Sequence, residues 1–228
     1  MSQHQNIVRL KAIHHALGNI QNEVVYVGGA ILSLYANQPI LEVRATSDVD
    51  IIIEIVTYGQ RAALEEKLRG LGFEHDIASG IICRFRYDGF IVDVMPTNDN
   101  TIGFHNIWYA EAFTNAVTCA LDENVNIRIP TAAHYIATKL EAFKGRGQND
   151  GYSSHDFEDI IFVLQTRSTI WAEINASKPE LLNYLKTHFT DLYNNPLLPS
   201  WIEGCIDKQL DAAATNKILN QWSAFIKH

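Results

Sequence analysis

The stretch that most constrains this chain is a short apolar run, Val24–Val27, followed directly by Gly28 and Gly29. The run predicts a buried strand, and the apolar spacing after the glycines predicts a helix. Because glycines carry no Cβ, an anion can approach the backbone N–H groups at the start of that helix. On its own such a pair is more often an ordinary turn. With the features below, it indicates a phosphate-binding turn.

Two alternating carboxylates form the second feature. Asp48 and Asp50 lie in a predicted strand over residues 48–55, so both should point to the same face of a sheet. Asp93 interrupts an otherwise apolar strand over residues 90–95, where a lone charge is costly unless it is paired or binds a cation. Carboxylate oxygens are ligands that Mg²⁺ prefers. We therefore expect these three aspartates to hold Mg²⁺, with two ions and a nucleoside triphosphate (NTP) as substrate.

A simpler explanation of Asp93 stays open. The runs over residues 81–87 and 90–95 are joined by Asp88-Gly89, a strong hairpin signal. In such a hairpin, Asp93 could instead form a salt bridge with Arg84 or Arg86.

Composition bounds the class of protein. The chain has 228 residues, and 18 basic against 26 acidic residues give a net charge of −8. This balance argues against a broadly basic nucleic-acid binder but allows a local basic patch. Three separated cysteines form neither a disulfide framework nor a zinc pattern. With neither a signal peptide nor a membrane-length apolar run, we expect a cytoplasmic protein that makes no membrane contact.

The order of elements predicts an α/β (α+β) fold, with a mixed sheet in the first part and a mainly helical second part. We place the two domains at residues 1–129 and 130–228. The elements expected besides those above are helices over residues 6–17, 61–71, 130–145 and 156–165, strands over 116–121 and 125–129, and a helical remainder.

The glycine pair, the segment Ser47–Asp50 and Asp93 together resemble the nucleotidyltransferase superfamily of the DNA polymerase β type. The segments Ala137–Phe143 and His155–Ile160, with Arg146, look like the AbiEii-like abortive-infection nucleotidyltransferases, the toxins of type IV toxin–antitoxin systems. The resemblance covers roughly residues 24–164. It implies a mixed-sheet nucleotidyltransferase core in the domain 1–129.

The resemblance also implies roles for individual residues. Gly28 and Gly29 would contact the NTP phosphates, Asp48 and Asp50 would hold the metals, and Asp93 would ligate the catalytic metal and help to deprotonate the acceptor. Further nucleotide-site candidates are Ser47, Lys139, Arg44, Arg146 and Asp156.

Several of these candidates have plainer alternatives. Lys139 would reach the triphosphate from the helical half, although a lysine beside an apolar stripe is equally a snorkelling surface residue. Three roles stay open for Arg44 and Ser47: they orient the strand that contains Asp48, they contact phosphate, or they do neither. Ala30 departs from the many relatives that have Ser or Thr after the glycines, which removes a hydroxyl donor to phosphate.

Three functions follow as hypotheses. The first is transfer of a nucleoside monophosphate (NMP) from an NTP to an RNA acceptor such as the 3′ end of tRNA, as in a toxin, with an antitoxin protein as a further partner. The second keeps the chemistry but uses a small acceptor such as an aminoglycoside or lincosamide antibiotic. The third is an inactive nucleotide-binding module, which need not keep three mutually repelling carboxylates together.

Overall fold

The computed structural model describes residues 2–38, 43–55, 57–98, 106–147, 150–206 and 213–227. The sequence also predicts that the helix after the glycines ends around residues 37–39 and that a polar loop covers residues 148–153; Pro39 and Gln148 lie outside the described residues. The chain divides into two compact units: Met1–Leu34 with Glu42–Thr131, and Tyr35–Leu41 with Ala132–His228. The sequence placed the domain boundary between residues 129 and 130; that these units are separate domains stays a prediction.

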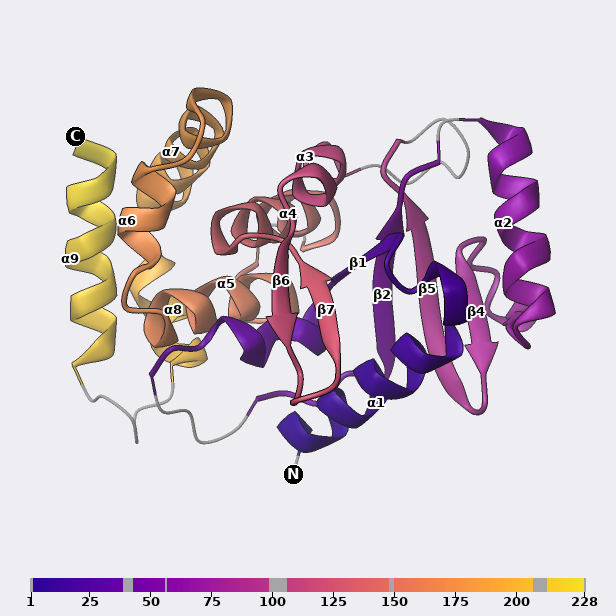
Figure 1. Ribbon diagram of the computed structural model, residues 1–228. Helices are drawn as coiled ribbons and strands as arrows, with labels where there is room; N and C mark the ends of the chain where they lie inside the picture. The colour runs from indigo at the N-terminus through magenta and orange to yellow at the C-terminus, as the bar shows by residue number, and fades with distance from the viewer. Residues whose placement is uncertain are drawn as a thin grey trace. The chain divides into compact units, whose positions relative to one another are not determined.

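The first unit is built on a mixed sheet, which confirms the predicted α/β class. The described residues form a five-stranded sheet in the order β1-β2-β5-β4-β3, with β2 and β5 parallel and the other pairs antiparallel (Figure 1). The first unit also contains a separate two-stranded antiparallel hairpin, β6–β7. The strands are β1 (Val24–Val27), β2 (Asp48–Ile53), β3 (Glu74–His75), β4 (Arg84–Tyr87), β5 (Phe90–Pro96), β6 (Val117–Ala120) and β7 (Asn126–Ile129).

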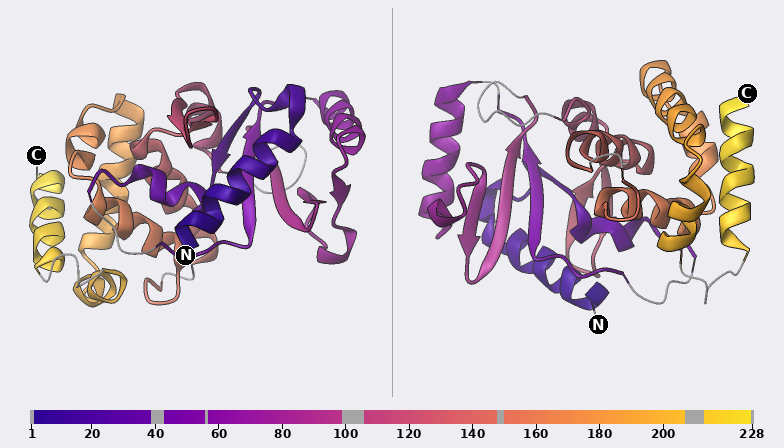
Figure 2. Two further views of the ribbon diagram at one scale, coloured as in Figure 1. Left: turned by 60° about the horizontal axis from the view of Figure 1, so that its bottom comes forward. Right: turned by 180° about the vertical axis from the view of Figure 1, so that it is seen from behind.

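Helices pack on both faces of this sheet. The helical elements of the first unit are α1 (Ser2–Ala16), η1 (Gly18–Ile20), η2 (Gly29–Tyr35, whose last residue groups with the second unit), α2 (Tyr58–Gly70), η3 (Ile77–Ser79) and α3 (Tyr109–Thr114). Helix α1 crosses one face, and the view from behind shows the strands in front of it (Figure 2). On the opposite face, Tyr109 and Ala112 of α3 pack against Val25, Val27 and Ile52.

Local chemistry explains where the predicted bounds shift. Helix α2 begins three residues before the predicted start because Thr57 and Gln60 form a capping box. The helix after the glycines is a 3₁₀-helix of seven residues. Residues 81–83 lie outside β4; Ile81 and Ile82 are exposed, and a turn through Ser79 and Gly80 precedes them. Short elements such as β3 and α3 carry too few residues to show a periodicity in the sequence.

The second unit is helical, as the sequence predicted. Its helices are α4 (Ala132–Arg146), α5 (His155–Thr166), α6 (Ile170–Asn175), α7 (Pro179–Tyr193), α8 (Leu198–Cys205) and α9 (Ala214–Lys227). Ser154 caps α5 by accepting a hydrogen bond from the Phe157 N–H. The segment that begins at Tyr35 joins this unit because the Asn37 N–H donates to the Thr166 carbonyl at 3.1 Å and Tyr35 stacks on Tyr135. Among the described residues, no helix is both long and apolar enough to cross a membrane.

Candidate functional site

The first glycine of the pair packs directly against a predicted catalytic carboxylate. Gly28 follows β1 with a φ of +72°, and Val27 is paired with Asp50 of β2. A Cβ on Gly28 would lie 1.9 Å from Oδ2 of Asp50. Glycine is therefore required here both by the left-handed backbone and by the position of Asp50. The Gly-Gly turn therefore packs directly against β2, the strand that carries Asp50.

The second glycine lies against the loop that precedes β2. A Cβ on Gly29 would lie 2.7 Å from Cγ2 of Thr46 and 3.0 Å from Nη2 of Arg44. The guanidinium of Arg44, a candidate left open by the sequence, therefore lies beside the Gly-Gly turn. Ser47 is exposed and directly precedes Asp48. Contact of these residues with phosphate stays a prediction.

The strand register brings the three predicted aspartates to one face of the sheet. Asp50 is directly opposite Asp93 in the parallel β2–β5 ladder. Asp48 lies two residues before Asp50, on the same face. Asp93 is 8% exposed, whereas Asp48 and Asp50 are half-buried. The parallel pairing of segments more than forty residues apart could not be read from the spacing of the motifs.

Arg84 contributes a positive charge to this cluster. It faces Asp93 across the β4–β5 ladder, with Nε donating to Oδ1 at 2.8 Å and Nη2 donating to Oδ2 at 2.7 Å. Nη2 also lies 3.4 Å from Oδ2 of Asp48. The hydrogen bond with Asp93 raises the pKa of Arg84 above its ordinary value, so it stays protonated. Of the two salt bridges left open for Asp93, the structure shows the one with Arg84; Arg86 pairs with Asp76.

The chemistry of the three aspartates fits a divalent cation. They supply hard oxygen ligands on neighbouring strands, and Gly28 leaves space at Asp50 that a side chain would fill. Within the described residues, however, no three or more His, Cys, Asp or Glu side chains converge closely enough to hold a metal. Arg84 is bound to two of the three carboxylates instead.

Helix α1 fixes the loop between the glycine turn and the aspartates. Asn6 is fully buried; its Nδ2 donates to the Arg44 carbonyl at 3.1 Å, and its Oδ1 accepts from the Thr46 N–H at 3.2 Å. Nη1 of Arg9 donates to the Thr46 carbonyl, and the Thr46 hydroxyl donates to the Asp48 carbonyl at 3.1 Å. This role of α1 was not predicted from the sequence. The available signal is that Asn6 is a polar residue on the apolar stripe that continues through Leu10.

The candidates in the second unit form a cluster of their own. The Lys139 ammonium lies 3.1 Å from Oδ1 of Asp156 and 2.6 Å from Oδ2 of Asp159. Arg146 forms a bidentate pair with Asp156, its Nε and Nη2 donating at 2.7 and 2.9 Å. Lys139 and Asp159 are buried, so Lys139 is an interior residue of this unit and not a snorkelling surface lysine. A role for Lys139, Arg146 or Asp156 at the nucleotide stays a prediction.

The charges of this cluster stabilise one another. Desolvation would lower the pKa of Lys139, but the attraction of Asp159 and Asp156 outweighs it and leaves the pKa raised. Desolvation likewise opposes ionisation of Asp156, but hydrogen bonds and charges from Arg146 and Lys139 leave the pKa of Asp156 lowered. Lys139 and Asp156 are therefore both charged near neutral pH.

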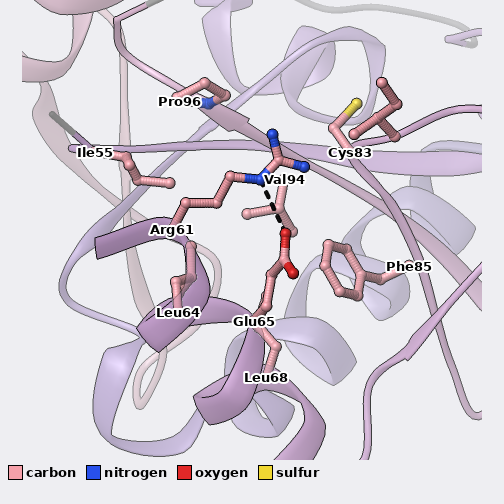
Figure 3. A pocket seen from close by; sticks show the side chains of 10 residues that line it. Ile55, Arg61, Leu64, Glu65, Leu68, Cys83, Phe85, Val94 and Pro96 are labelled. Atoms are coloured by element: carbon pink, nitrogen blue, oxygen red, sulfur yellow. Dashed lines mark hydrogen bonds and ion pairs between the residues drawn. The ribbon is translucent and has the colours of Figure 1, made fainter. Parts of the chain in front are cut away.

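A small pocket lies on the other face of the sheet from the aspartates. Phe85 and Val94, the strand neighbours of Arg84 and Asp93, line it together with Leu64 and Leu68 of α2 (Figure 3). The ion pair of Arg61 and Glu65 closes one side. Its volume of about 20 Å³ holds about one water molecule, so this pocket does not accommodate a nucleotide.

Comparison with solved structures finds the same fold in an antigenic nucleotidyltransferase-like protein from Paracoccidioides brasiliensis. The two chains are 17% identical, the match covers 93% of this chain and 99% of the other, and the TM-score is 0.52. At this identity the likeness concerns the fold. No protein-family model matches the sequence. No curated protein matches it either.

Proposed function

We propose that this chain is a nucleotidyltransferase that moves an NMP from an NTP to an acceptor hydroxyl, with release of pyrophosphate. The observation that carries the proposal is the packing of Gly28 against Asp50, combined with the register that places Asp50 beside Asp93. The fold that the chain shares with a nucleotidyltransferase-like protein supports the proposal.

In this proposal each residue around the glycine turn and the aspartates has a specific role. Gly28 and Gly29 let the triphosphate approach the main chain, and Arg44 contributes positive charge beside it. Ser47 offers a hydroxyl from the exposed start of β2. Asp48, Asp50 and Asp93 would hold Mg²⁺, and Asp93 takes the proton of the acceptor hydroxyl at a carboxylate oxygen. The chemistry that bound Mg²⁺ supplies is a lower pKa for the attacking hydroxyl and neutralisation of phosphate charge.

RNA is the acceptor that we favour, in a toxin-like role in the cytoplasm with an antitoxin as partner. Arg146 and Lys144 both reach solvent near the end of α4, although each is paired with a carboxylate, Asp156 and Glu141 respectively. The net charge of −8 supports instead a cationic small acceptor such as an aminoglycoside, which keeps the second hypothesis in the test.

The inactive-module hypothesis also gains one observation. Repulsion among three carboxylates argues against a module that merely binds, but Arg84 contacts two of them and offsets one negative charge. On this hypothesis, a protein without catalytic activity keeps the aspartates because their pairing with Arg84 stabilises the fold.

The test is transfer of label from each α-³²P NTP, with Mg²⁺, to total small RNA and separately to an aminoglycoside and lincosamide panel. Label on RNA supports the toxin-like enzyme, and label on a small molecule supports the resistance-type enzyme. An absence of label from both, with no binding of any NTP, contradicts the proposed activity.

A further inference from the structure

Arg84 holds the same oxygen atoms that a divalent cation would need. Both carboxylate oxygens of Asp93 accept hydrogen bonds from its guanidinium, at 2.8 and 2.7 Å, and Oδ2 of Asp48 lies 3.4 Å from Nη2. The Arg84 and Asp93 side chains are 19% and 12% exposed, so water screens the pair only in part. A divalent cation would compete with the guanidinium for these oxygen atoms, because it needs the same lone pairs and negative charge.

We propose that Arg84 is a displaceable internal counter-ion of the aspartate cluster, and that a divalent cation binds only when Arg84 releases Asp48 and Asp93. This inference rests on the metal assignment of the proposed function and adds a residue that controls it. Without a cation, the guanidinium offsets one negative charge among carboxylates that the parallel register places side by side. With a cation, the guanidinium becomes available to a phosphate, which it binds as readily as a carboxylate.

The neighbouring strand position provides a matched control. Arg86 lies on the same face of β4, two residues from Arg84, and pairs with the buried Asp76 at 2.9 Å. Arg86→Gln removes the same charge from the same strand but leaves the Arg84–Asp93 pair in place. Any general effect of lowering the positive charge of the hairpin therefore appears in both variants.

The experiment measures Mn²⁺ binding to the full chain by electron paramagnetic resonance, in the wild type, Arg84→Gln, Arg84→Lys and Arg86→Gln. We expect Arg84→Gln to bind Mn²⁺ at least about tenfold more tightly than the wild type, since one lost charged hydrogen bond changes an equilibrium by about that factor. Arg84→Lys should also bind more tightly than the wild type, because an ammonium cannot hold both oxygens in the same fork. Arg86→Gln should match the wild type.

Thermal unfolding gives a second measurement. Mn²⁺ should raise the Tm of Arg84→Gln more than that of the wild type, because a ligand stabilises the state that binds it more tightly. If Arg84→Gln does not fold, Arg84→Lys tests the proposal on the same two measurements.

Equal or weaker Mn²⁺ binding in the Arg84 variants than in the wild type overturns the proposal and leaves the metal assignment standing, provided that Asp93→Asn weakens binding. Absence of Mn²⁺ binding in every variant contradicts the metal assignment itself. The two failures are thus distinguished by the wild type and Asp93→Asn.

Discussion

Arg84 and Asp93 face each other across the β4–β5 ladder and are joined by two hydrogen bonds of 2.8 and 2.7 Å. The pair lies beside Asp50, which is opposite Asp93 in the next ladder. The cluster is thus a set of carboxylates whose resident cation belongs to the protein. The structure shows the state in which Arg84 pairs with the carboxylates, and a second state that receives an exogenous cation is our proposal.

The steric demand at Gly28 gives the first prediction. Gly28→Ala should destabilise the chain by about 1–3 kcal/mol, since it adds a clash with Asp50 and a side chain at positive φ. Gly70→Ala is the control. Gly70 is the last residue of α2, and a Cβ there meets nothing within 4 Å. This variant should leave the stability of the chain unchanged or raise it by up to about 1 kcal/mol. Urea unfolding measures both. Equal stability of Gly28→Ala and the wild type would contradict the packing of Gly28 on Asp50.

The anchoring of the Arg44–Thr46 loop gives the second prediction. Asn6→Leu should cost about 2–4 kcal/mol, because it leaves a buried N–H and a carbonyl without the partners that Asn6 supplies. Hydrogen exchange at the Thr46 amide should accelerate by more than the change in global stability accounts for. Asn183→Leu, at an exposed position of α7, is the control. Unchanged exchange at Thr46 would show that α1 does not hold the loop.

The interior ion cluster gives the third prediction. Lys139→Met should destabilise the chain by about 3–5 kcal/mol, because it removes the ammonium that pairs with the buried carboxylates of Asp156 and Asp159. Lys144→Met, on the same helix but half exposed, should change stability by no more than about 0.5 kcal/mol. Chemical denaturation of both variants is the measurement. A small effect at Lys139 would mean that Asp159 has enough other partners.

The pH dependence of the same cluster gives the fourth prediction. The pKa of Asp156 is lower in the folded state, so its stabilising contribution is present above its unfolded value of about 3.8 and is lost as the pH falls through the folded value. The stability difference between wild type and Asp156→Asn should therefore be constant from about pH 5 to 8 and shrink below about pH 4. Denaturation curves across this range test it. If the stability difference instead grows as the pH falls, the pKa of Asp156 is raised in the folded state, which contradicts the prediction.

Much of the fold follows from local pattern, and the remainder depends on long-range pairing. The apolar run of β1, the hairpin turn at Asp88-Gly89 and the helical spacing over residues 156–165 are local signals, and each leads to the observed element. The sequence also indicated that Gly28, Asp50 and Asp93 belong together. It could not choose Arg84 over Arg86 as the partner of Asp93, because both point to the same face and only the sheet register separates them.

The direct test of the central hypothesis is the NMP-transfer assay applied to matched aspartate variants. The wild type should transfer label from an α-³²P NTP, Asp50→Asn should lose at least about a hundredfold, and Asp76→Asn should retain it. Asp76→Asn breaks the pair between the buried Asp76, which directly follows β3, and Arg86 of β4 without touching the cluster, so it controls for lost stability. Circular dichroism confirms that all three proteins are folded at the assay temperature. Transfer that persists in folded Asp50→Asn would contradict the assignment of this cluster as the catalytic site.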